Sequence, residues 1–330
     1  MTKRVLPVLA ALLTSVAVAA CGSSSGGKGS ISLVAYSTPK EAYADLIPAF
    51  QKTPAGKGAQ FTQSYGASGD QSRAVDSGLH ADVVAFSLEP DVTRLVKDGI
   101  VDASWNANAH KGMVTDSVVV FAVRKGNPKH IKTWQDLAKP GVGVIEPNPF
   151  TSGGARWNVM AAYGSQIAQG RTDKQAEAYL GALFKNVVVQ DKSARDALQT
   201  FAGGKGDVLI AYGNEAITAQ QKDIKLDYVI PDQTILIENP IAVTKKAGDP
   251  AKAKAFVNFL WTSEAQKIFA AKGYRSVDSS LVDRKKYPTP KTLFNIQKFG
   301  GWKPVMDKFF DPQKGVVAAI EQKLGVSTGG

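Results

Sequence analysis

Short apolar runs alternate with amphipathic segments along most of this chain of 330 residues. Most of the runs are continuously apolar, as expected for strands that are buried on both faces of a parallel sheet. The segments between them place apolar residues at helical spacing, so the pattern predicts an α/β fold. The predicted strands are 32–36, 82–86, 117–123, 142–145, 186–189, 207–212, 228–230 and 241–243.

The N-terminus has the features of an export signal. A basic start precedes an apolar run over 5–20, which is too short for a membrane span and typical of a secretory leader. The run ends in Val-Ala-Ala before Cys21, the only cysteine, and so resembles a lipoprotein signal whose cysteine is acylated. We therefore predict a signal peptide over 1–20 and a lipidated flexible tether over 21–31, which holds the protein on the outer face of the cell membrane.

The chain is strongly basic. Its 40 Lys and Arg against 29 Asp and Glu give a formal charge of +11. Such a charge suits nucleic acid, anionic lipid or a small anion. The basic residues are scattered and the chain carries an export signal, so no nucleic-acid partner is expected.

Residues 151–158, TSGGARWN, place Ser152, Gly153 and Gly154 at the start of a predicted helix. Glycine costs roughly 1 kcal/mol relative to alanine inside a helix, so two in succession require a reason. Bare N–H groups at a helix start, together with the positive end of the dipole, attract an anion without any cationic side chain. The alternative is that Ser152 only caps the helix and the glycines ease a tight turn.

Three further predicted helices begin with small polar residues after a strand. Residues 38–41 spell a T-x-x-E capping box with proline at the first helical position, Ser68 lies in YGASGDQS, and Ser193 begins S-x-x-D. Each alone favours a simple cap. Four such starts together favour a ligand site, because ligands bind at the carboxyl ends of strands in open α/β sheets.

Catalytic chemistry has little support in the sequence. The histidines His80, His110 and His130 show no metal-binding spacing, so neither a metal site nor a cofactor is expected. Ser68 lies in G-A-S-G-D, one residue short of a nucleophile elbow. A secreted serine hydrolase that uses Ser152 or Ser68 is the alternative from another functional class.

Longer blocks carry a family resemblance. The segments 124–158, 182–201, 206–216 (GDVLIAYGNEA) and 299–302 (FGGW) are similar to the periplasmic sulfate-binding proteins of sulfate ABC transporters. The resemblance spans about 32–311 in order. It implies a two-lobe periplasmic-binding-protein fold of type II, a hinge of two crossover strands, and a receptor without enzyme activity that delivers sulfate to permease subunits.

The resemblance also implies a sulfate site of backbone N–H, hydroxyl and indole donors, without a countercharged side chain. The implied donors of the second lobe are Ser152, Gly153, Gly154 and the backbone of Ala194. Ser68 would donate from the first lobe. Ser37 falls where the family has an aspartate that donates only its backbone N–H.

Two positions depart from the family pattern. Tyr212 replaces the tryptophan whose indole donates, and a phenol can still donate to an anion. Asp70 stands where the family tends to carry lysine; we expect it to face solvent, although it could accept a proton from phosphate. Thiosulfate, molybdate and phosphate are therefore alternative ligands. Since none of the implied donors titrates, the predicted affinity is nearly flat between about pH 5 and pH 8.

The resemblance divides the mature chain into two lobes. The first would comprise 32–122 and 240–330, and the second 123–239, with crossovers near 117–125 and 235–243. The route of the segment after Lys291 is not predicted. We expect a monomer.

Overall fold

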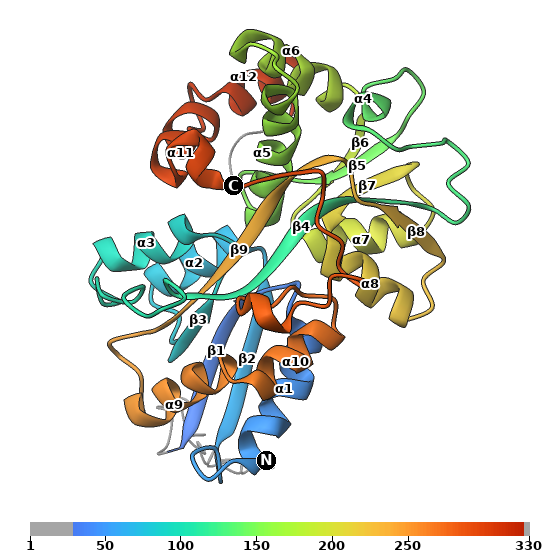
Figure 1. Ribbon diagram of the computed structural model, residues 1–330. Coiled ribbons are helices and arrows are strands. Elements are labelled where there is room, and N and C mark those ends of the chain that lie inside the picture. Colours follow the sequence, from blue (N-terminus) through green and yellow to red (C-terminus); the bar gives the residue numbers. More distant parts are fainter. Residues whose placement is uncertain (1–28, 327–330) are drawn as a thin grey trace, which may run out of the picture.

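In the computed structural model, which describes residues 29–326, two α/β lobes are joined by two long strands (Figure 1). These strands, β4 (Met113–Arg124) and β9 (Gln233–Val243), pair antiparallel in the middle of the molecule. β9 continues to pair with β3, while β4 continues to pair with β7. The sheet order is β2-β1-β3-β9-β4-β7-β5-β6, with β8 on β4 and β10 on β9. The predicted leader and Cys21 lie outside the described residues.

The first lobe is built on parallel strands that end at a common edge. Its strands are β1 (Ser30–Tyr36), β2 (Gln60–Gly66) and β3 (Val83–Ala85). Its helices are α1 (Lys40–Lys52), α2 (Ser68–Asp76), α3 (Glu89–Lys97), α9 (Pro250–Leu260) and α10 (Ser263–Ala271). In α1 the apolar residues Tyr43, Leu46, Ile47 and Phe50 share one face, which explains why this helix is buried against the sheet.

The second lobe repeats this arrangement. Its strands are β5 (Val144–Pro147), β6 (Val187–Asp191), β7 (Val208–Tyr212) and β8 (Leu226–Val229). Its helices are α4 (Trp134–Leu137), α5 (Gly153–Ala168), α6 (Asp173–Phe184), α7 (Ala194–Ala202) and α8 (Gly213–Gln221). The helix α5 is buried along nearly its whole length, beside β9 and α6.

The C-terminal segment returns to the second lobe. Its elements are η1 (Ser279–Leu281), β10 (Thr292–Phe294), η2 (Ile296–Phe299), α11 (Trp302–Phe309) and α12 (Val316–Lys323). Trp302 meets Trp157 edge to face at 4.6 Å, and Phe309 meets Tyr163 at 4.7 Å, both partners lying on α5. The predicted division assigned this segment to the first lobe, whereas its apolar side chains share a core with the second.

The predicted α/β class is confirmed, and each predicted strand overlaps an observed one. The strand β2 was missed because its sequence, QFTQSYG, is largely polar and it lies at the sheet edge. Within residues 29–326, no helix combines the length and the apolar character that crossing a bilayer requires.

Candidate functional site

The carboxyl ends of strands from both lobes converge at the centre of the molecule. Ser37 directly follows β1, and Ser68 is the second residue after β2. From the second lobe, Ala194 follows β6 and Tyr212 ends β7. Ser37, Ser68, Ser152 and Tyr212 are buried, although three of them are serines. The parallel strands thus bring together polar residues that lie far apart in the sequence.

Gly154 lies at the point where the predicted second-lobe donors meet. A Cβ atom at this position would lie 3.4 Å from Ser152 Oγ, 3.5 Å from Ala194 Cβ and 3.6 Å from Tyr212 Cε1. Ser152 is the N-cap of α5, and its Oγ accepts from the backbone N–H of Ala155 at 3.4 Å. The predicted cap is therefore present, and the same hydroxyl still holds a hydrogen that no described residue accepts.

Gly153 allows the two lobes to approach each other closely. A Cβ here would lie 2.5 Å from Leu88 Cδ2 and 2.8 Å from Ser87 Cβ, closer than real side chains come. Ser87 and Leu88 belong to the loop after β3 in the first lobe. The first glycine of the pair is thus required by interlobe packing, while the second leaves open backbone at the helix start.

Ser68 is the first residue of α2 rather than its cap. Its hydroxyl donates to Asp91 Oδ2 at 2.6 Å and accepts from the backbone N–H of Ser87 at 2.9 Å. The next residue, Gly69, donates its N–H across the interlobe boundary to the Thr151 carbonyl at 3.1 Å. Because the Ser68 hydroxyl hydrogen is already used, the free donor at this position is the backbone N–H of the first helical turn.

Ser87 is a central residue that the sequence analysis missed. It is 1% exposed, and its Oγ lies 2.7 Å from Tyr212 OH. Its carbonyl accepts from Trp157 Nε1 and from Asn239 Nδ2, both at 2.8 Å. Ser87 directly follows the predicted strand 82–86, just as Ser37 follows the predicted strand 32–36, so the position alone was a usable signal.

Glu215 lies in the first turn of α8 and contacts the backbone of Tyr212. Its carboxylate accepts from the backbone N–H of Tyr212 and from Thr38 Oγ1, each at 3.3 Å. Burial raises the pKa of Glu215 to about 7, and burial also raises the pKa of Tyr212 well above that of a free phenol. Tyr212 therefore keeps its hydrogen at neutral pH, whereas Glu215 titrates there.

The capping box predicted over 38–41 is wrong. Pro39 is the N-cap of α1 and no side chain caps this helix. The Thr38 hydroxyl donates to Glu215 instead, and Glu41 forms ion pairs with Arg195 and Lys222 of the second lobe. Burial would raise the pKa of Glu41, but the hydrogen bonds from both cations outweigh it and lower that pKa to about 2.

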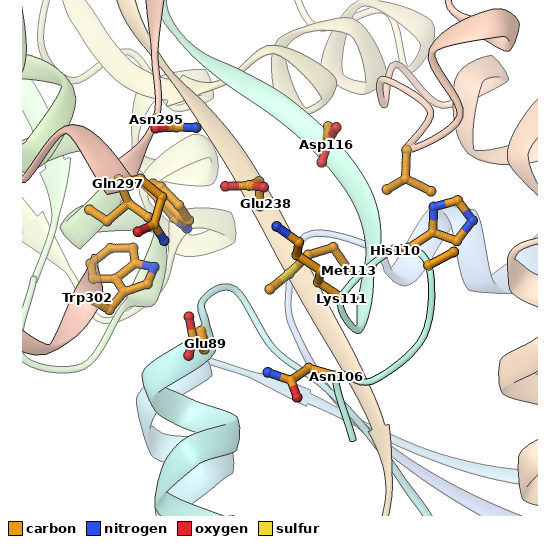
Figure 2. A pocket seen from close by; sticks show the side chains of 14 residues that line it. Glu89, Asn106, His110, Lys111, Met113, Asp116, Glu238, Asn295, Gln297 and Trp302 are labelled. Carbon is orange, nitrogen blue, oxygen red and sulfur yellow. The ribbon is translucent and has the colours of Figure 1, made fainter. Parts of the chain in front are cut away.

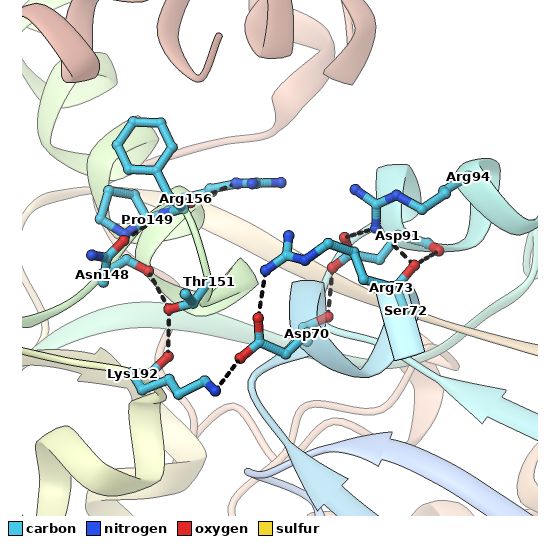
Figure 3. Close-up of polar contacts among 12 residues, drawn as sticks. Asp70, Ser72, Arg73, Asp91, Arg94, Asn148, Pro149, Thr151, Arg156 and Lys192 are labelled. Atoms are coloured by element: carbon cyan, nitrogen blue, oxygen red, sulfur yellow. Dashed lines mark hydrogen bonds and ion pairs between the residues drawn. The ribbon is translucent and has the colours of Figure 1, made fainter. Parts of the chain in front are cut away.

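Asp70 does not face solvent as predicted. Its carboxylate pairs with Arg73 on its own helix and with Lys192 of the second lobe at 3.0 Å, and it is 25% exposed (Figure 3). Ser193 behaves as predicted and caps α7, its Oγ accepting from the N–H of Asp196 at 3.2 Å. The charged side chains around the site are thus largely paired with one another.

A cavity of about 540 Å³ lies elsewhere, along the two crossover strands (Figure 2). Glu89, Asp116 and Glu238 point into it, and none of the seven predicted site residues lines it. Burial and the neighbouring Glu238 raise the pKa of Asp116 to about 8. At neutral pH this cavity is therefore lined by Glu89, Glu238 and Lys111 together with a protonated Asp116.

His80 and His110 contact residues other than Ser68 and Ser152. His80 Nε2 lies 3.3 Å from Asp82 Oδ1, and the ring of His110 stacks on Trp261. Within residues 29–326, no histidine contacts Ser68 or Ser152, the two nucleophiles of the hydrolase alternative.

Known proteins match most of the chain. The family model described as bacterial extracellular solute-binding protein covers residues 31–275. A sulfate-binding protein of Synechococcus elongatus is 43% identical in an alignment of 329 positions that covers 94% of this chain and 94% of that protein. A thiosulfate-binding protein of Pseudomonas aeruginosa is 35% identical over 84% of this chain and 88% of its own.

A solved structure matches as well. The sulfate-binding protein SubI from Mycobacterium tuberculosis is 44% identical, with a TM-score of 0.83 over 86% of this chain and 99% of that one. Sequence and fold agree over most of the chain, and the chain therefore belongs to the bacterial extracellular solute-binding proteins, within their periplasmic sulfate-binding family.

Proposed function

We propose that the protein is an extracytoplasmic receptor that captures sulfate between its lobes and delivers it to an ABC importer. The observation that carries the proposal is the meeting of Ser152, Ala194 and Tyr212 around Gly154 in the second lobe, with Ser87 of the first lobe 2.7 Å from the Tyr212 hydroxyl. Sulfate is a pure hydrogen-bond acceptor at neutral pH, so such a set of donors matches it.

Charge in the surroundings supports the same ligand. Arg195, next to Ala194, is the nearest cation in sequence, and its guanidinium donates to the Ser37 carbonyl and to Glu41. An anion at the site is therefore held by dipoles rather than by a free cation. The donors in this proposal are Ser37, Ser68, Ser152, Gly153, Gly154, Ala194 and Tyr212, with Ser68 contributing its backbone N–H.

We assign the lobes from the packing of the described residues. The first comprises about 32–122 and 240–291, and the second 123–239 together with 292–326, because the C-terminal aromatic residues pack on α5. In this proposal the ligand binds between the lobes. When the lobes close on it, they re-form the interlobe contacts of Gly153 with Ser87 and of Gly69 with Thr151.

Delivery completes the proposed role. Acylated Cys21 anchors the monomeric receptor to the outer face of the cell membrane, and the tether after it gives the lobes freedom to reach the permease subunits of the importer.

Thiosulfate is the second candidate ligand. The relative from Pseudomonas aeruginosa is named for this anion, which carries the same charge and one larger atom. Molybdate and phosphate complete the panel of tetrahedral oxyanions that the same donors would reach.

The test is calorimetric titration of residues 29–330 with sulfate, thiosulfate, molybdate and phosphate. Sulfate is expected to bind tightest. Stronger binding of thiosulfate would change the assignment within the family, and absence of binding by all four anions would refute it. Labelling of Ser152 or Ser68 by a fluorophosphonate would instead favour the hydrolase.

A further inference from the structure

Two hydroxyl groups from opposite lobes meet beside the first turn of α5. Ser87 Oγ and Tyr212 OH lie 2.7 Å apart, and each side chain is 1% exposed. A Cβ atom on Gly153 would lie 2.9 Å from Ser87 Oγ, and one on Gly154 would lie 3.6 Å from Tyr212 Cε1. The hydroxyl pair therefore lies against the two glycines whose N–H groups hold the anion in the proposed function.

Ser87 is fixed from three sides. Its N–H donates to Ser68 Oγ in the first lobe, and its carbonyl accepts from Trp157 of α5 and from Asn239 of β9. The Ser68 hydroxyl is itself held by Asp91. With the backbone held in this way, the freedom left at Ser87 is the direction of its hydroxyl hydrogen.

Counting hydrogens shows what the pair can do. Two hydroxyls hold two hydrogens, and the bond between Ser87 and Tyr212 uses one of them. The other is left to donate to an anion. The Asn239 side chain also bonds to Tyr212, so the oxygen that can still accept is that of Ser87. A fully deprotonated oxyanion takes the free hydrogen. An oxyanion that carries a hydrogen donates it to one oxygen of the pair, and the two hydroxyls turn so that the other still donates back.

We propose that Ser87 and Tyr212 form a specificity-determining pair. This pair lets the site bind oxyanions that carry a hydrogen as well as fully deprotonated ones. The inference rests on the proposed function. The pair has an amphoteric character that neither backbone N–H groups nor an indole can supply, since those groups only donate. A site of donors alone would reject the hydrogen of phosphate, because that hydrogen would face another donor.

The test measures the dissociation constants of inorganic sulfate and inorganic phosphate at pH 7 for four proteins: wild type, Ser87→Ala, Tyr212→Phe and the double variant. Each single variant keeps one hydroxyl and so still offers one hydrogen to sulfate. We expect sulfate affinity to fall less than fivefold in either single variant and at least fiftyfold in the double variant. The ratio of the phosphate to the sulfate dissociation constant is expected to rise at least tenfold in both single variants.

Ser165→Ala is the matched control, because Ser165 is fully buried on α5 and its hydroxyl donates to the Ala162 carbonyl, away from the site. It is expected to leave both constants within twofold. Thermal unfolding of each variant checks that the fold is kept.

The possible results distinguish failure of the Ser87–Tyr212 inference from failure of the proposed function. Sulfate losses that multiply in the double variant, or a phosphate to sulfate ratio that stays within twofold of wild type, would overturn the pair while leaving the receptor assignment intact. A wild-type protein that fails to bind sulfate would refute the proposed function, and the inference with it.

Discussion

Arg195 of the second lobe reaches across to the first, where its Nε and Nη2 donate to the carbonyl oxygen of Ser37 at 3.2 and 3.1 Å. The same guanidinium donates to Glu41 through Nη1 at 2.8 Å. A single side chain therefore ties the backbone at the end of β1 to the helix start at Ala194, and both positions belong to the proposed site.

Replacing Arg195 by alanine should weaken sulfate binding by about tenfold to a hundredfold, mainly through faster dissociation, since the closed form loses charged hydrogen bonds between lobes. Stopped-flow displacement measures the rate. Lys222→Ala is the matched control, because Lys222 pairs with the same Glu41 but its side chain is 51% exposed. Equal effects of both variants would contradict a special role for the Ser37 contact.

Gly154→Asp should abolish sulfate binding in a folded protein, because a carboxylate would occupy the anion's place and repel it. The neighbours of a Cβ here lie at ordinary contact distances, so Gly154→Ala should fold and bind more weakly. In contrast, Gly181 of α6 has no heavy atom within 4 Å of its Cβ position, and Gly181→Ala should stabilise the helix by about 1 kcal/mol without changing affinity. Calorimetry and denaturant unfolding check both, and tight sulfate binding by folded Gly154→Asp would remove α5 from the site.

Sulfate affinity should fall several-fold as the pH rises from about 6 to 8. Burial raises the pKa of Glu215 to about 7, so this carboxyl is neutral below that pH and negative above it. A dianion beside Tyr212 binds the neutral form better, which links binding to proton uptake. This replaces the flat profile expected from the sequence. Titrations across this range should show the slope in wild type and lose it in Glu215→Gln; a flat wild-type profile would refute the link.

Trp302→Ala should lower the free energy of unfolding by about 3 to 5 kcal/mol, because the indole is buried against Trp157. The loss should also weaken sulfate binding, since Trp157 holds the Ser87 carbonyl. Leu324→Ala, at a side chain that is 40% exposed, should change stability by less than about 0.5 kcal/mol. Urea unfolding followed by titration measures both, and unchanged stability of Trp302→Ala would mean that the C-terminal segment is dispensable.

Cys21→Ala should release the protein from the membrane or leave its leader uncleaved, because the acyl chains are its predicted attachment. Cell fractionation with an antibody to the mature chain checks this. A cleaved variant that still sediments with membranes would show that another contact anchors it.

The strands were predictable because continuous apolar runs such as VLIAY of β7 fit a sheet that is covered on both faces. The helix caps at Ser152 and Ser193 were predictable for a local reason, since each hydroxyl accepts from a backbone N–H only three residues further along the chain. The edge strand β2 was missed, because half-exposed polar residues carry no such signal.

The errors have a common physical origin in partners that are distant in sequence. Thr38 and Glu41 satisfy a local capping rule, yet Glu215 and Arg195, more than 150 positions away, bind them instead. Asp70 likewise meets Lys192, a residue of the other lobe that lies 122 positions away in the sequence. A pattern of caps can predict a helix start, but it cannot rank a local partner against one that folding brings from the other lobe.

The strand β10 changes what the hinge can do mechanically. It pairs parallel with residues 233–235 of β9, so the chain passes between the lobes a third time, alongside one of the crossover strands. A hinge of two strands can both bend and twist. A third segment that is hydrogen-bonded to one of them, and is held at its far end by α11 and α12, resists twisting of the hinge but still allows it to bend. We therefore expect opening to follow one direction of rotation, so that in the proposed receptor Ser37 and Gly154 would separate and return along the same path.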